Sequence, residues 1–294
     1  MPFTLAHLSD PHLPTPAPRL AELFSKRVTG YINWRRNRRL IHDRAVLDAL
    51  TADLAARKAD HIAVTGDIVN IAAAAEFAPG AAWLASLGSA HDVSFVPGNH
   101  DIYVAAGGRY AAQAWGPYMT GDSGGLGFPY VRRRGPLALI GLSTGVPTMP
   151  GMATGTLGIR QIEALVALLG DLKNQHVFRV VLIHHPPLSE AGWHKRLTDR
   201  KRLMRAIAAV GAELLLHGHD HRRMLNWLAG PAGTRVPAVG VPSASASPAT
   251  AKQAAAYNLY FIDGEPGAWS CQMTSRGIGR GGKVSEAQLL TLFG

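Results

Sequence analysis

The fold of this chain can be worked out from one stretch, Val93-Ser94-Phe95-Val96-Pro97-Gly98-Asn99-His100-Asp101. Its short apolar start predicts a buried strand, and Pro97-Gly98 ends that strand sharply. An amide, an imidazole and a carboxylate follow at once, and an amide oxygen and an imidazole are good ligands for borderline metal ions. Alone, the stretch is also compatible with an ordinary turn, so its meaning depends on the other strand ends.

Composition and charge narrow the class of protein. The chain has 294 residues, 47% of them hydrophobic, which is enough for a sizeable core. A net charge of +10 favours an anionic partner such as a phosphoester, nucleic acid or an acidic membrane surface, although basic chains also exist without one. The single cysteine, Cys271, excludes an internal disulfide. With no secretory signal and no membrane-spanning apolar run, we expect a cytoplasmic protein, with membrane association left open.

Four other predicted strands end in similar polar chemistry. They precede Asp10-Pro11-His12, Gly66-Asp67, His184-His185-Pro186-Pro187 and His217-Gly218-His219-Asp220-His221. Because the predicted strands alternate with helices, we expect a largely parallel sheet with both faces covered. Ligands of such sheets bind beyond the carboxyl ends of the strands, so these groups are predicted to form one site.

The remaining pattern predicts the covering helices. They are expected over Asp43–Arg57, Ala72–Leu87, a segment from Ile159 to Leu169, and Asp199–Val210. The second should break near Pro79-Gly80. The poorly patterned, glycine-rich segment Ile102–Pro136 is predicted to be a long loop or small excursion near the site. We see no repeat or linker, and therefore expect a single domain over residues 1–294.

A basic segment, Leu20–Arg44, interrupts this pattern as an excursion over about residues 19–44. It combines apolar residues at helical spacing with Lys26, Arg27, Arg35, Arg36, Arg38, Arg39 and Arg44. Three interpretations are open: a helical excursion docked on the domain with a solvated basic face, an amphipathic helix on an anionic membrane or lipid substrate, or a nucleic-acid contact. Gly30 is expected to weaken one continuous helix.

The predicted site contains carboxylates, imidazoles and one amide, but no cysteine. Such a set selects Mn, Fe or Zn over the metals of thiolate sites. It holds too many ligands for one open catalytic ion but enough for two, and two metal ions suit hydrolytic phosphoryl transfer. One carboxylate must then bridge the ions, and Asp67 is the natural candidate because a tight Gly66-Asp67 turn projects it from a central strand.

Taken in order, these motifs resemble the signature of the calcineurin-like metallophosphoesterases, and they span positions 10 to 221. Gly98-Asn99-His100-Asp101 and His184-His185-Pro186-Pro187 further resemble the bacterial cyclic-nucleotide and glycerophosphodiester phosphodiesterase branch. The resemblance implies an α/β fold, a four-layer sandwich of two mixed sheets flanked by helices, with a dinuclear centre. It implies that one ion is bound by Asp10, His12 and His221, the other by Asn99, His184 and His219, and both by Asp67. His184 is preferred to His185 because it leaves the strand first, and this choice stays open.

The resemblance also implies a reaction. Two divalent cations (Mn, Fe or Zn) would lower the pKa of a bridging water, and the hydroxide would attack phosphorus in line. His100 has the family position for contacting the phosphate or protonating the leaving oxygen. Asp101 is expected either to orient His100 or to cap the loop. Five other histidines are expected to be surface or packing residues: His7, His42, His61, His91 and His176. His217 lies beside the motif and is expected to point into the opposite face.

The function expected from these observations is metal-dependent phosphoester hydrolysis, with a phosphodiesterase favoured over a phosphomonoesterase. A lipid-linked pyrophosphate hydrolase or a nuclease of the same fold is the alternative. A non-catalytic phosphate-binding scaffold is disfavoured, because no ligand of the pattern is missing. The chain itself does not choose the substrate.

Overall fold

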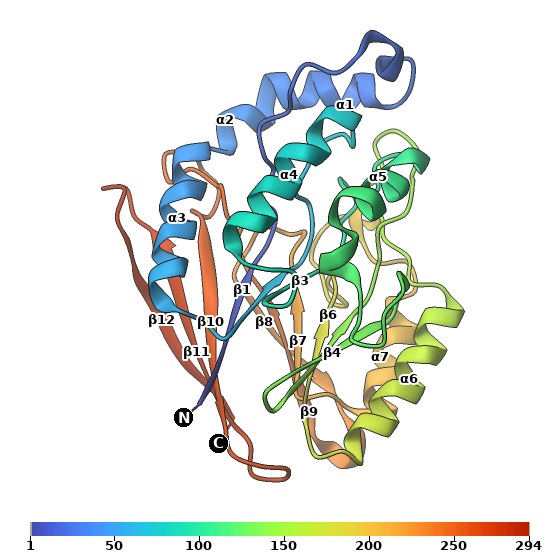
Figure 1. The fold of residues 1–294 in the computed structure, drawn as a ribbon, viewed down its shortest axis with the longest axis vertical. Helices are drawn as coiled ribbons and strands as arrows, with labels where there is room; N and C mark the ends of the chain where they lie inside the picture. The colour runs from blue at the N-terminus through green and yellow to red at the C-terminus, as the bar shows by residue number, and fades with distance from the viewer. Residues whose placement is uncertain (1, 294) are drawn as a thin grey trace.

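The computed structural model describes residues 2–293, which form two facing sheets with helices on their outer faces (Figure 1). Both sheets have six strands, in the orders β12-β11-β10-β1-β2-β3 and β4-β5-β6-β7-β9-β8. Each sheet mixes parallel and antiparallel pairs. The predicted four-layer arrangement of two mixed sheets flanked by helices is confirmed.

The first sheet joins the start of the chain to its end. Its strands are β1 (Phe3–Leu8), β2 (His61–Val64), β3 (Val93–Phe95), β10 (Ala256–Asp263), β11 (Ser270–Ile278) and β12 (Val284–Phe293). The first three run parallel, and β10 pairs antiparallel with β1. Their parallel direction brings the carboxyl ends of β1, β2 and β3 to one edge.

The second sheet is built from the middle of the chain. Its strands are β4 (Tyr130–Arg134), β5 (Leu137–Gly141), β6 (Phe178–Leu182), β7 (Leu214–His217), β8 (Met224–Ala229) and β9 (Arg235–Gly240). The strands β5, β6, β7 and β9 are parallel, and antiparallel β4 and β8 form the edges. Sequence patterning missed β8 and β9, because Pro237 interrupts the signal of a strand that lies inside the sheet.

Five longer helices cover the sheets. They are α3 (Arg44–Arg57), α4 (Ala74–Leu87), α5 (Ala105–Trp115), α6 (Ile159–Lys173) and α7 (Arg200–Val210). In Figure 1, α3 and α4 lie along the first sheet, and α6 and α7 lie along the second. One apolar core between the sheets contains Leu8 and Phe95 of the first and Phe178 of the second, all fully buried. A second core fills the space between the second sheet and α6 and α7.

For the segment between β2 and β4, the predicted helix break and the predicted long loop were wrong. Helix α4 runs unbroken through Pro79-Gly80. The glycine lets the helix approach Trp115 closely, since a Cβ at Gly80 would lie 2.7 Å from the indole ring. The segment Ile102–Pro136 contains α5, a short helix η3 (Gly116–Met119) and β4 rather than a long loop. Gly107 weakens the helical signal, but it packs directly against the carbonyl of Asp101, so tertiary contact outweighs propensity.

The basic segment is a helical excursion that lies across the carboxyl ends of the strands (Figure 1). A short helix η1 (Leu20–Leu23) precedes α1 (Arg27–Asn33), η2 (Trp34–Arg38) and α2 (Arg39–Ile41), which follow one another without a break. The middle piece is a π-helical turn, which rotates the side chains that follow it relative to an ordinary α-helix. Two short helices, η4 (Trp193–Lys195) and η5 (Pro231–Gly233), complete the structure.

Buried contacts hold this excursion on the domain. The guanidinium of Arg27 donates to the carbonyls of Ile71 (3.2 Å) and Ala72 (2.6 Å). The helix continues through Gly30, which faces Tyr103 so closely that a Cβ would lie 2.8 Å from the phenol oxygen. The glycine that lowers helix propensity is therefore the one that permits docking.

Candidate metal centre

The predicted ligands gather at the carboxyl ends of β1, β2, β6 and β7 and in the loop after β3. Five of them adopt the left-handed backbone conformation, with φ between 41° and 70°: Asp10, His12, Asp67, His219 and His221. This conformation costs about 1–2 kcal/mol for a residue with a Cβ. Such strain concentrates at functional sites, where the surrounding structure enforces it.

The first ligand group consists of Asp10, His12 and His221. The Nε2 atom of His221 lies 3.1 Å from Oδ1 of Asp10 and 3.2 Å from Nε2 of His12. The Nδ1 atom of His12 faces the carbonyl of Val69 at 3.4 Å. Nε2 of His12 is therefore the nitrogen available at the centre.

The second group consists of Asn99, His184 and His219. Nε2 of His184 lies 3.2 Å from Oδ1 of Asn99, while its Nδ1 donates to the carbonyl of Thr65 at 2.6 Å. His219 is turned the other way, because its Nε2 is 2.8 Å from the carbonyl of Lys195. Its Nδ1 is therefore the nitrogen free to bind an ion.

Asp67 lies between the two groups. Its Oδ2 is 3.3 Å from Nε2 of His184 and 3.9 Å from Nε2 of His12. The φ of Gly66 is +100°, as expected for the tight turn that projects this carboxylate. A Cβ at Gly98 would overlap the Asp67 carboxylate, so glycine is required there as well.

The contacts also distinguish His184 from His185. Both ring nitrogens of His185 already have protein partners: Nδ1 lies 2.7 Å from the hydroxyl of Thr144, and Nε2 lies 3.1 Å from the carbonyl of Ala153. Nδ1 of His184 also has a backbone partner, but its Nε2 faces two other predicted ligands, Oδ1 of Asn99 at 3.2 Å and Oδ2 of Asp67 at 3.3 Å. These contacts favour His184 as the ligand.

The electrostatics of the site suit cations. Burial acts to raise the pKa of Asp67, but His184 and His100 outweigh it and hold that pKa well below its usual range. Burial alone would lower the pKa of His184, yet the Asp67 charge raises it to about 10. Burial lowers the pKa of His219 to about 3, which keeps that ring in the neutral form that binds metals. The donor set of carboxylates, imidazoles and one amide oxygen fits two divalent ions.

The carboxylate of Asp101 contacts backbone rather than a catalytic side chain. It is fully buried and accepts from the N–H groups of Asp67 (2.8 Å), Ile68 (2.9 Å), Val69 (3.2 Å) and Gly98 (2.8 Å). Among residues 2–293, the Asp101 carboxylate makes no hydrogen bond to the His100 ring. Of its two expected roles, orienting His100 or capping the loop, the contacts favour the second. Asp101 holds the turn that carries Asp67.

His100 lies at the opening of the centre. Its Nδ1 is 2.5 Å from the carbonyl of Asn70, and its backbone N–H donates to Oδ1 of Asp67 at 2.7 Å. The ring stacks on Tyr103 with the centroids 5.8 Å apart. These contacts leave Nε2 as the ring nitrogen that can meet a ligand.

Sequence reasoning missed two residues of the excursion. Arg38 was grouped with the surface cations, but its Nη1 lies 3.4 Å from Nδ1 of His12 and 3.5 Å from Nδ1 of His100. His42 was taken as a surface or packing residue, yet its ring centroid is 4.5 Å from that of His12. Their four-residue spacing was the available signal, since such residues share a helix face. Only the docking of the helix shows which face meets the site.

The other histidines lie away from ligand positions, as predicted. His7 and His61 are buried against the hydroxyls of Thr65 (2.9 Å) and Ser94 (2.8 Å), and His217 is buried beside the motif. His91 and His176 are exposed.

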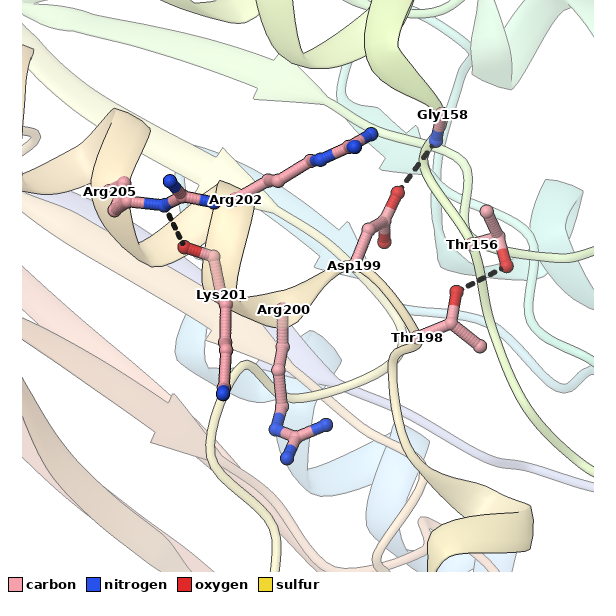
Figure 2. Close-up of a pocket in the computed structure, with 8 residues that line it drawn as sticks. All are labelled: Thr156, Gly158, Thr198, Asp199, Arg200, Lys201, Arg202 and Arg205. Atoms are coloured by element: carbon pink, nitrogen blue, oxygen red, sulfur yellow. Dashed lines mark hydrogen bonds between the residues drawn. The ribbon is translucent and has the colours of Figure 1, made fainter.

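A separate surface hollow lies at the start of α7 (Figure 2). It is lined by Thr156, Gly158, Thr198, Asp199, Arg200, Lys201, Arg202 and Arg205. None of the predicted ligands lines it. The carboxylate that lines this hollow, Asp199, already accepts from the N–H of Gly158 at 2.8 Å. It therefore stabilises the loop before α7.

Comparison with known proteins gives the family. The sequence profile of the calcineurin-like phosphoesterases (Metallophos) matches residues 3–223. The chain belongs to this family. Its membership and the clustered His and Asp side chains support metal-dependent phosphoester hydrolysis at a dinuclear centre. Among curated proteins, none matches the sequence.

Solved structures share the fold at low sequence identity. A dimetal phosphatase from Danio rerio is 14% identical, with a TM-score of 0.65 and 99% of both chains covered. The purple acid phosphatase PPD1 of yellow lupin (Lupinus luteus) is 13% identical, with a TM-score of 0.60; the match covers 98% of this chain and 53% of that one. In residues 2–293, no helix combines the length and apolarity needed to cross a membrane.

Proposed function

We propose that this calcineurin-like phosphoesterase is a phosphodiesterase that hydrolyses its substrate at two divalent metal ions. The observation that supports it is the convergence of Asp10, His12, Asp67, Asn99, His184, His219 and His221 from five chain segments. Asp10, His12 and His221 would hold one ion, Asn99, His184 and His219 the other, and Asp67 both. When bound, the two ions would activate a water molecule and neutralise phosphate oxygens.

Arg38 is proposed to bind the phosphoryl group. The two nitrogens nearest its guanidinium, on His12 and His100, face the carbonyls of Val69 and Asn70 and therefore donate elsewhere. No carboxylate of the described chain lies within 4.0 Å of the guanidinium. The positive charge of the Arg38 guanidinium would be repelled by two bound metal ions. An anion between the guanidinium and the ions offsets this repulsion, and a phosphoryl oxygen supplies that anion.

His100 is proposed to act on the leaving group. The Asn70 carbonyl fixes the proton on Nδ1, so Nε2 is presented to the substrate. The Tyr103 ring stacked against it restricts the imidazole to this orientation. Arg38 and His100 would thus position the phosphoryl group, while Asp101 keeps the Asp67 turn in place.

Metal-stripped protein with Mn²⁺ added back tests this function. We would compare bis-p-nitrophenyl phosphate with p-nitrophenyl phosphate, each with and without metal. Metal-dependent turnover that favours the diester supports the proposal. Turnover that favours the monoester contradicts the diester preference, and metal-bound protein inactive on both contradicts hydrolysis of simple phosphoesters.

A second candidate concerns where the substrate resides. The outer side of the excursion exposes apolar residues: Leu20, Phe24 and Leu40 are 80%, 92% and 68% exposed. Arg35, Arg36 and Arg39 are exposed on the same excursion. Exposed apolar and cationic side chains together favour an anionic lipid surface. We therefore propose that the excursion contacts such a surface and that the substrate is a lipid-linked phosphoester; a nuclease has no comparable support.

Vesicle binding tests this second candidate. Changing Arg35, Arg36 and Arg39 to Gln should weaken partition onto anionic vesicles on the order of 100-fold, at about 1 kcal/mol per charge. Changing Lys201, Arg202 and Arg205 to Gln removes the same charge from α7, and these exposed residues serve as the control (Figure 2). Equal losses in both variants would indicate a net-charge effect and refute a specific face.

A further inference from the structure

His42 lies beside His12 and His221 of the first ligand group. Its ring centroid is 4.5 Å from that of His12 and 5.7 Å from that of His221. His12, His42 and His221 each place one ring nitrogen within 4.8 Å of the other two. His42 is not part of the motif pattern that identifies the family, since it comes from the excursion.

The backbone around His42 is held firmly. His42 follows α2 and forms a bridge with Ala246. The neighbouring Asp43 N–H donates to the carbonyl of Ser245 at 2.8 Å, and the Ser247 N–H donates to the carbonyl of Ile41 at 2.8 Å. The ring is therefore placed by a paired segment rather than by a free loop.

The hydrogen-bond contacts of His42 favour a proton on Nδ1. The Ser243 hydroxyl donates to the carbonyl of Asp10 at 2.6 Å, so its oxygen is free to accept from the Ser245 hydroxyl at 3.3 Å. Nδ1 of His42 lies 2.8 Å from the Ser245 oxygen and 3.3 Å from the Ser243 oxygen, and we assign the proton to Nδ1 because each hydroxyl then both donates and accepts. This order leaves Nε2 of His42 unprotonated, and Nε2 has no hydrogen bond to any residue from 2 to 293.

We propose that His42 is an additional ligand of the ion held by Asp10, His12 and His221, and that it binds through Nε2. Metal-ligating histidines commonly donate their other N–H to a fixed acceptor, which orients the ring and raises its basicity. Ser245 is such an acceptor. This inference rests on the proposed dinuclear function but adds a ligand that the family motifs do not contain.

An added imidazole makes the two metal sites unequal. The first would have three imidazoles, from His12, His42 and His221, whereas the second has two, from His184 and His219. Imidazole favours Zn, Fe and Co over Mn, which prefers oxygen ligands. We therefore expect the first site to prefer Zn²⁺ or Co²⁺ more strongly than the second, and His42 to contribute to that preference.

The substitution His42→Asn isolates the ligand atom. An asparagine amide nitrogen can take the position of Nδ1 and retain the Ser245 contact, while Nε2 is lost. His42→Gln instead reaches toward the position of Nε2 with a weaker oxygen ligand. His91→Asn is the matched control, because the His91 side chain is 73% exposed and outside the site.

Calorimetric titration of chelator-treated protein with Zn²⁺ and with Co²⁺ gives the test without any substrate. For His42→Asn we expect one of two equivalents to bind about 10- to 100-fold more weakly, with a changed visible spectrum of the Co²⁺ form. His42→Gln should recover part of the affinity, and His91→Asn should match the unaltered protein. The metal-free variants should unfold at similar temperatures.

Two results would overturn the inference. If the unaltered protein binds two equivalents and His42→Asn binds both with unchanged affinity and spectrum, His42 is no ligand although the dinuclear proposal stands. If the unaltered protein binds fewer than two equivalents, the dinuclear proposal and this inference fail together.

Discussion

Replacing Arg38 with Met is the sharpest test of the excursion's role in hydrolysis. The nearest protein nitrogens, on His12 and His100, donate to other groups and therefore do not accept from the Arg38 guanidinium, which we propose binds a phosphoryl oxygen. A hydrogen bond to a charged group contributes about 1.5–3 kcal/mol. Losing it should lower kcat/KM by about 10- to 150-fold, since each 1.36 kcal/mol is tenfold in rate.

The assay compares Arg38→Met, Arg38→Lys and Arg36→Met under saturating Mn²⁺ with a diester substrate. Arg36 is exposed on the same π-helical turn, so its variant controls for charge and helix stability. Lysine keeps the charge without the planar fork and should recover only part of the rate. Inhibition by inorganic phosphate should weaken in parallel for Arg38→Met, while metal affinity stays unchanged. An Arg38→Met enzyme as active and as phosphate-sensitive as Arg36→Met would refute the reasoning.

Three further outcomes follow from the described contacts. Asp67→Asn removes the carboxylate that we propose both ions share, so turnover should fall to background and two-metal binding should be lost by calorimetry; retained turnover would rule out the bridge. Asp101→Asn leaves some of the four backbone N–H groups that the carboxylate accepts from without a partner. The free energy of unfolding, measured by urea denaturation, should fall by at least about 2 kcal/mol. An unchanged midpoint would contradict the capping role. Burial raises the pKa of Cys271 to about 12, so the thiol should react with a disulfide reagent only after unfolding, and fast labelling of native protein would contradict its burial.

Much of the site could be predicted before the fold was known. The predicted ligands follow strands, and parallel strands end at the same edge of a sheet, so local patterns already place Asp10 with Asp67, which follow β1 and β2. His184 follows β6 of the other sheet, and only the packing of the two sheets brings it to this edge. The apolar runs of the central strands are strong signals because those strands are buried on both faces. The weaker predictions concerned segments whose glycines and prolines have tertiary partners, such as Gly80 against Trp115 and Gly107 against Asp101.

The sequence by itself determined the α/β class, the order of the metal-binding motifs and the chemistry of the donor set, because these depend on local periodicity and side-chain type. Only the tertiary structure favours His184 over His185 as a ligand, since the partners of each ring come from distant segments. It also decided that Arg38 and His42 face the centre while Arg35, Arg36 and Arg39 face solvent. The arginines of one charged helix look alike in the local sequence. Only the π-helical turn and the docking of Arg27 determine which side of the helix faces the strand ends.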